Sequence, residues 1–208
     1  MTPRNYLIAA ITAGAAIIAG VIALLVLPSR GPAPEPQNVE SNLPVPIGGA
    51  FTLTRADGTP ARDEDFRGRY MLVFFGFTHC PDICPTTLDK IGRTLSALGD
   101  GAAKIAPIFI SVDPARDTPE IVGDYVAFFD KRIVGLTGSA EQVAQAAKAY
   151  KIYFQKIELE NGEYTVDHTT LVYFMGPDGK FRSIYRDEQT ADKMAQDIRA
   201  IMEKDGML

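Results

Sequence analysis

The sequence predicts an α/β domain in which helices flank a mixed central sheet. Two continuous apolar runs, Met71–Phe77 and Ile105–Val112, are rich in aromatic and β-branched residues, which is typical of strands buried on both faces. A segment with the features of a helix follows each run, and the last third of the chain contains short strand-like segments separated by turns. Strands joined by crossover helices are therefore expected to precede antiparallel strands.

The order of the individual elements favours a thioredoxin-like fold with insertions. The predicted strands are Phe51–Thr54, Met71–Phe77, Ile105–Val112, Ile133–Leu136, Tyr153–Leu159, Tyr164–Thr169, Leu171–Met175 and Phe181–Tyr185. The predicted helices are Ile83–Leu98, a segment that ends near Phe129 with Asp117 or Thr118 as N-cap, a segment that ends near Tyr150, and a last helix that ends near Lys204. Turn and capping signals mark the boundaries, namely Asp57-Gly58, Gly99, Ser139 with Gln142, Asn161-Gly162, Pro177-Asp178-Gly179 and Thr190.

Residues 1–27 are expected to form a transmembrane anchor. Arg4 is the only charged residue before an apolar run from Tyr6 to Leu27, and about 22 residues with a rise of about 1.5 Å each can cross a bilayer core. A cleaved signal peptide is the alternative, but its apolar region is shorter and ends at a small-x-small site, whereas this run ends in the letters LLVLP. We therefore expect an anchor that stays attached, with a slight positive-inside bias for a cytoplasmic N-terminus.

Residues 28–46 are expected to be a proline-rich tether that precedes a folded domain at residues 47–208. Six prolines lie between positions 28 and 46, with little that can be buried, so this segment should be semi-extended. The formal net charge of −5 argues against nucleic acid as a partner. Two cysteines and two histidines permit at most one small metal site.

The chemistry of the protein is expected at Cys80 and Cys84, which lie where a buried strand ends and a helix begins. The positive end of a helix dipole favours the thiolate form at this place, and four-residue spacing is expected to put both sulfur atoms on one face. A structural disulfide or two thiols packed as small apolar groups are the alternatives, but a bridge that closes so short a loop restrains the unfolded chain little. Two converging thiolates suit Cu(I), whereas Zn(II) prefers a fourth ligand that the sequence does not obviously provide.

His168 is the candidate third ligand, because it lies at the end of a predicted strand and imidazole can complete a three-coordinate site or help to bind Cu(II). A surface or hydrogen-bonded histidine is the alternative, and spacing alone does not place it beside Cys80. His79 adjoins Cys80, but a neighbour at a strand end points away from it, so a structural or electrostatic role is expected. Asp82 is expected to cap the helix, with modulation of the thiols as the alternative, and Asp113 to brace a loop.

Three segments resemble the signatures of the Sco/SenC family. They read FGFTHCPDICP at 75–85, SVDPARDTP at 111–119 and VDHT at 166–169. The resemblance covers about residues 45–205 in the right order, and it implies a membrane-anchored protein with a thioredoxin-like fold that binds copper. By position, Cys80, Cys84 and His168 would be the copper ligands, for Cu(I), Cu(II) or both.

The function that this resemblance implies is delivery of copper to the binuclear copper site of cytochrome c oxidase, or reduction of the cysteines of that site before loading. The expected partners are the oxidase subunit that carries the site, and other periplasmic copper chaperones or thiol reductants. No Arg- and Ser-rich transit sequence precedes the anchor, which favours a bacterial inner membrane with the folded domain in the periplasm. A thiol–disulfide oxidoreductase that uses Cys80 and Cys84 as redox-active residues, without copper transfer, is the alternative function. It has no need of His168.

Overall fold

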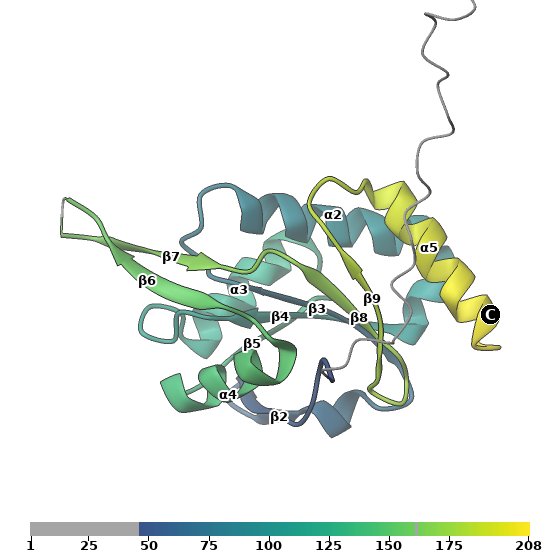
Figure 1. The fold of residues 1–208 in the computed structure, drawn as a ribbon, viewed down its shortest axis with the longest axis horizontal. Helices are drawn as coiled ribbons and strands as arrows, with labels where there is room; N and C mark the ends of the chain where they lie inside the picture. Colours follow the sequence, from purple (N-terminus) through teal and green to yellow (C-terminus); the bar gives the residue numbers. More distant parts are fainter. Residues whose placement is uncertain (1–45, 161) are drawn as a thin grey trace, which may run out of the picture. The chain divides into compact units, whose positions relative to one another are not determined.

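Strand β3, Tyr70–Gly76, lies at the centre of a seven-stranded sheet in the computed structural model, which describes residues 46–160 and 162–208 (Figure 1). All seven residues of β3 are buried, as expected from its continuous apolar sequence. Strand β4, Ile105–Ser111, pairs with it in parallel, and strand β8, Val172–Met175, pairs with it antiparallel on the other side. The predicted mixed sheet is therefore confirmed.

The sheet has the strand order β2-β1-β5-β4-β3-β8-β9. The remaining strands are β1 (Thr52–Arg55), β2 (Pro60–Arg62), β5 (Val134–Thr137) and β9 (Phe181–Tyr185). Strands β3, β4 and β5 are parallel to one another, and the other pairings in this sheet are antiparallel.

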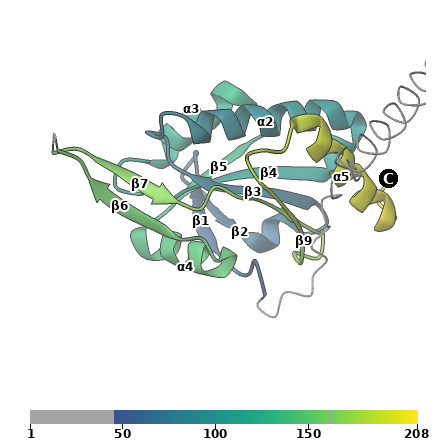
Figure 2. The same ribbon diagram turned by 45° about the horizontal axis from the view of Figure 1, so that its top comes forward.

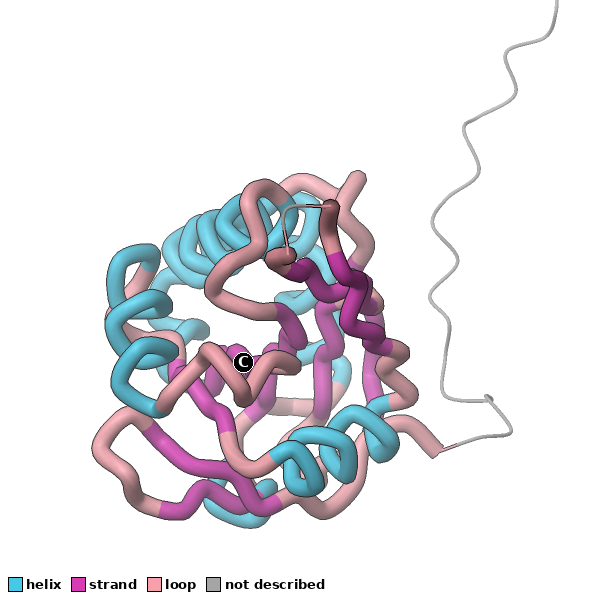
Figure 3. Tube along the Cα trace, turned by 90° about the vertical axis from the view of Figure 1, so that its left-hand side faces the viewer, coloured by secondary structure: helices cyan, strands magenta, loops and turns pink. Residues whose placement is uncertain are grey.

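Helices cover both faces of the sheet, as predicted for a thioredoxin-like fold (Figures 2 and 3). They are α2 (Ile83–Leu98), α3 (Pro119–Phe129), α4 (Ala140–Tyr150) and α5 (Ala191–Lys204), with short 3₁₀ turns at Asp63–Phe66 and Gly99–Lys104. The crossover helices α2 and α3 lie on one face, and α4 lies on the other, where the Tyr150 ring packs 5.4 Å from that of Phe75. Thr118, Ser139 and Thr190 cap α3, α4 and α5, and this confirms the predicted helix starts.

Strands β6, Phe154–Glu158, and β7, Tyr164–His168, form a separate two-stranded sheet (Figure 1). The sequence predicts both strands but not their separation from the main sheet. The side chains of β6 are exposed or only partly buried, whereas Val166 of β7 is 7% exposed. The hairpin therefore rests on the domain through one face, and it carries His168 at its base.

Several sequence predictions concern residues outside the described ranges. The proposed anchor at 1–27 and residues 28–45 of the tether lie there, as does Asn161 of the predicted turn at Asn161-Gly162. In the ranges 46–160 and 162–208, no helix has the length and apolar character that a membrane crossing needs.

Candidate metal centre

Cys80 and Cys84 lie on different elements at the carboxyl end of β3. Cys84 belongs to the first turn of α2 and is buried, whereas Cys80 lies in the turn that precedes the helix and is partly exposed. Its backbone N–H donates to the carbonyl of Phe77 at 3.3 Å. The prediction that helical spacing brings both sulfur atoms to one face is wrong in its cause, since only Cys84 is helical. A turn brings Cys80 to the helix start.

Gly76, the last residue of β3, allows Cys84 to approach the strand closely. A Cβ atom at this position would lie 2.7 Å from the Cys84 Sγ and 2.8 Å from the Phe109 ring. Real side-chain contacts are not this short, so an added methyl group must displace one of these neighbours.

Gly76→Ala is therefore expected to lower the free energy of unfolding by about 1–3 kcal/mol. The measurement is urea unfolding of the reduced, metal-free protein. Gly101→Ala is the matched control, because its Cβ would meet only the Leu208 side chain at an ordinary 3.5 Å. We expect the control to remain within about 0.5 kcal/mol of wild type. Equal effects of the two substitutions would contradict the close approach at Gly76.

The fold places His168 at the same edge of the sheet as the two thiols. Strand β7 ends at His168, and β8 begins at Val172, which pairs with Phe74 near the carboxyl end of β3. Because β8 is antiparallel to β3, the amino end of β8 lies beside the carboxyl end of β3, where the Cys80 turn begins. The imidazole ring packs edge-on against the ring of Phe77, with 5.7 Å between the ring centres.

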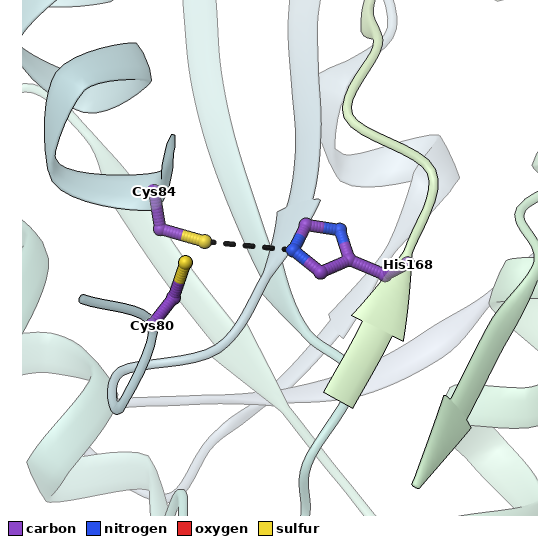
Figure 4. Close-up of side chains that lie close together, drawn as sticks. All are labelled: Cys80, Cys84 and His168. Carbon is purple, nitrogen blue, oxygen red and sulfur yellow. Dashed lines mark hydrogen bonds between the residues drawn. The ribbon is translucent and has the colours of Figure 1, made fainter. Parts of the chain in front are cut away.

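Three candidate ligand atoms converge at this edge (Figure 4). The Cys84 Sγ lies 3.7 Å from the His168 Nε2, and the ligand atoms of Cys80, Cys84 and His168 all lie within 4.8 Å of one another. Bonds of about 2.0–2.3 Å to one metal ion place three ligand atoms about 3.5–4 Å apart. The donor set therefore fits a single ion after small side-chain adjustments.

A backbone hydrogen bond presents the correct nitrogen of His168 to the sulfur atoms. The Nδ1 atom lies 3.0 Å from the carbonyl oxygen of Thr169, and a carbonyl oxygen only accepts, so Nδ1 carries the proton of the neutral ring. The lone pair is then on Nε2, which faces Cys84. Metal-binding histidines commonly have this arrangement, because the bond behind the ring fixes its tautomer and orientation.

The two thiols differ in acidity. The Cys84 thiol donates a hydrogen bond to the Cys80 sulfur, and this bond lowers the pKa of Cys80 to about 3 although burial opposes the shift. Smaller contributions in the same direction come from the His168 side chain and from the backbone N–H groups of Asp82 and Cys84. The same hydrogen bond, burial and the charge of Cys80 raise the pKa of Cys84. The predicted lowering of the Cys80 pKa is confirmed, but the neighbouring Cys84 thiol contributes more to it than the start of the helix does.

The alkylation rate of reduced, copper-free protein tests this acidity. Because the lowered pKa keeps Cys80 ionised, its rate should be nearly independent of pH between about 5 and 8, whereas an unperturbed thiol with a pKa of about 8.5 gains about tenfold per pH unit. Cys84→Ala removes the hydrogen-bond donor and should restore a pH-dependent rate, while Cys84→Ser should do so less. A wild-type midpoint at or above about 8.5 would refute the assignment.

The other residues that the sequence analysis singled out support the centre without joining it. His79 lies near Asp117, with its Nδ1 3.8 Å from the carboxylate. The predicted capping role of Asp82 is wrong for its side chain, which makes no capping hydrogen bond; its backbone carbonyl accepts from Thr86 instead. Asp113 is buried and accepts hydrogen bonds from two side chains near the hairpin, which agrees with its predicted bracing role.

Sequence reasoning did not find the role of Asp117. Its fully buried carboxylate accepts hydrogen bonds from the backbone N–H and hydroxyl of Thr78, at 3.0 and 2.6 Å, and from the hydroxyl of Ser111 at 2.5 Å. It thereby holds the turn that carries Cys80. The sequence indicates Asp117 only as a possible helix N-cap, because no local pattern connects it with Thr78, which lies 39 residues away in the chain.

Comparison with known proteins decides the family. The SCO1/SenC family matches residues 39–203. This chain belongs to the SCO1/SenC family. The resemblance seen in its three sequence signatures is thereby confirmed. It is 39% identical over 159 residues to the human protein named "Protein SCO1 homolog, mitochondrial", a match that covers 75% of this chain and 53% of that protein. The chain spans about half of the length of several such relatives.

Solved structures of the SCO1/SenC family share the fold. ScoI of Arabidopsis thaliana with copper bound is 36% identical with a TM-score of 0.73, and the match covers 76% of this chain and 99% of that one. ScoI of Bradyrhizobium japonicum with copper bound is 42% identical with a TM-score of 0.69, and the match covers 74% of this chain and 98% of that one. These similarities support the predicted thioredoxin-like arrangement of the described domain.

Proposed function

We propose that this protein binds one copper ion as cargo through Cys80, Cys84 and His168, and delivers it to the binuclear copper site of cytochrome c oxidase. The observation that carries the proposal is the convergence of two sulfur atoms and one imidazole nitrogen within 4.8 Å. The copper-bound structures of similar proteins support it. Soft thiolates select copper in its Cu(I) state, and imidazole extends the site to Cu(II).

The composition of the site suits a transferable ion. In the part of the chain that the structure describes, no further histidine, cysteine or carboxylate joins Cys80, Cys84 and His168 as a fourth ligand. Structural zinc sites hold their ion with four protein ligands, so a three-ligand site leaves room for a ligand from an acceptor protein. Cys80 is partly exposed and Cys84 is buried, which makes Cys80 the side from which an acceptor thiolate can reach the ion.

The unequal acidity of the thiols favours a second candidate function, thiol–disulfide exchange. The Cys80 thiolate would attack one sulfur of a partner's disulfide, which releases the other sulfur as a thiolate and forms a mixed disulfide. Cys84, after it loses its proton, would attack the Cys80 sulfur, release the second partner thiolate and leave a Cys80–Cys84 disulfide. Two electrons pass to the partner, and a dithiol reductant would then restore this pair. The two functions are compatible, because thiols bind copper only when they are reduced.

A transfer experiment distinguishes the two functions. Full-length protein loaded with copper in detergent is mixed anaerobically with the metal-free copper domain of the oxidase subunit, whose cysteines are either reduced or joined in a disulfide. Delivery predicts that the optical spectrum of the binuclear site appears with the reduced acceptor. It also predicts that His168→Ala impairs this transfer and leaves disulfide reduction unchanged. Reduction of the acceptor disulfide without any copper transfer would support the oxidoreductase instead.

We also propose that residues 1–27 anchor the protein in a bacterial inner membrane, with the copper centre in the periplasm. The support is the length and apolar character of the N-terminal run and its lack of a cleavage site. Mass spectrometry of protein extracted from membranes should find the N-terminus uncleaved. A mature N-terminus between residues 13 and 40 would contradict the anchor.

A further inference from the structure

The hairpin that carries His168 is not held in place by pairing with the main sheet. Strands β6 and β7 pair only with each other within the described residues, and an isolated two-stranded hairpin is marginally stable in water. The bond from Nδ1 to Thr169 orients the imidazole within its own segment and does not fix that segment relative to the dithiol. The position of His168 therefore depends on contacts between the hairpin and the rest of the domain.

Arg116, in the loop between β4 and α3, makes these contacts at the hairpin. Its guanidinium lies over the Tyr164 ring, with 3.7 Å from Cζ to the ring centre, and its Nη1 donates to the Tyr164 carbonyl at 3.0 Å. Its Nε donates to Asp113 at 2.5 Å. The Tyr164 hydroxyl donates to the other oxygen of Asp113 at 2.9 Å, which closes a ring of contacts between loop and hairpin.

The same loop also contacts the turn that carries Cys80 and the Phe77 ring that packs against the imidazole. Asp117, the next residue, holds the Cys80 turn through Thr78. The Arg116 guanidinium lies 5.9 Å from the centre of the Phe77 ring, and that ring packs edge-on against His168. Residues 113–117 therefore connect to the thiols on one side and to the hairpin on the other.

We propose that Arg116 is a positioning residue for His168. With Asp113 and Tyr164 it fixes the hairpin so that the imidazole faces the dithiol, and it thereby sets how strongly the site binds the copper state that requires a nitrogen ligand. The expected effect of Arg116 on copper affinity rests on the proposed function. Its effect on the placement of the imidazole does not.

Arg116→Gln tests the proposal, because glutamine keeps the length of the chain near the backbone and removes the charge, the stacking and the paired bonds. We expect a Cu(II) affinity that falls about 10–100-fold, as is usual for loss of a group that orients a ligand. The charge-transfer band between thiolate and Cu(II) should change with it, while the Cu(I) affinity stays within about threefold because two thiolates suffice. Arg116→Lys should recover part of the loss, and Tyr164→Phe, which removes only the bond to Asp113, should have a smaller effect.

Arg132→Gln is the matched control. Arg132 also forms an ion pair at 2.5 Å, with Asp130, but its contacts are with α2 and the end of α3, not with the hairpin. It should leave the copper spectra unchanged. In a His168→Ala background, Arg116→Gln should have no further effect, since a residue that acts through another is not additive with it. A full additional loss there, or equal losses for both copper states, would overturn the proposal.

A measurement on the metal-free, reduced protein separates the failure of this inference from that of the proposed function. Nuclear Overhauser contacts between the rings of His168 and Phe77 should be present in wild type and in Arg132→Gln, and lost or weakened in Arg116→Gln. Thermal unfolding confirms that each variant is folded. If wild type binds no copper but Arg116→Gln still loses these contacts, the copper function is refuted and the positioning role stands. Retention of the contacts in Arg116→Gln would refute the positioning role whatever the copper result.

Discussion

Replacing either cysteine by serine is expected to abolish tight binding of both Cu(I) and Cu(II). A serine hydroxyl is a poor ligand for a soft metal ion, and the remaining thiolate and imidazole make a weak copper site. Loss of a group that only orients a ligand costs about 10–100-fold in metal affinity, so loss of one of two thiolates should cost at least about 1,000-fold. Titration against a competing copper chelator measures both affinities in full-length protein.

The two substitutions differ in their effect on the fold, which makes Cys80→Ser the cleaner test. Cys84 is fully buried in the core cluster, and a serine there places a hydroxyl among apolar groups, whereas Cys80 is only partly buried. Urea unfolding of both variants shows how much of any loss is structural. Wild-type copper affinity in Cys80→Ser would exclude a dithiol site and leave Cys80 with a redox role at most.

Local signals were sufficient to predict the framework around the dithiol. The unbroken apolar sequence of β3 requires burial on both faces, and such a strand has to lie inside a sheet covered by helices. The caps at Thr118 and Ser139 depend on side chains that bond backbone groups three residues away, so short windows of sequence are enough to find them. The placement of Cys80 and Cys84 at the end of this strand follows from the same local pattern.

Contacts between segments far apart in the chain could not be predicted in this way. His168 meets Cys84 across 84 residues because β8 runs antiparallel to β3, and no periodicity or capping signal specifies which strands pair. The bonds from Arg116 to Tyr164 and from Thr78 to Asp117 span 48 and 39 residues. Only the resemblance to a known family indicated that His168 belongs with the thiols, and it did not indicate what holds the imidazole there.

His168→Ala is expected to separate the two copper states. With both thiolates present, Cu(I) keeps a two-coordinate site, so its affinity should fall by no more than about tenfold, or about 1.4 kcal/mol. Cu(II) prefers tetragonal sites with nitrogen donors, and its affinity should fall by more than about 100-fold, with loss of the charge-transfer band that the complete site gives.

His79 provides the matched control for this prediction, because the described chain places it beside Cys80 in sequence but outside the group of three ligands. His79→Ala removes an imidazole that is exposed and lies near Asp117, so both copper affinities should stay within about threefold of wild type. If His79→Ala has the large effect on Cu(II) and His168→Ala has none, the nitrogen ligand has been assigned to the wrong residue. If neither substitution changes the spectrum or the affinities, neither imidazole is a ligand, and thiol–disulfide exchange, which needs only the two cysteines, is then favoured over copper delivery.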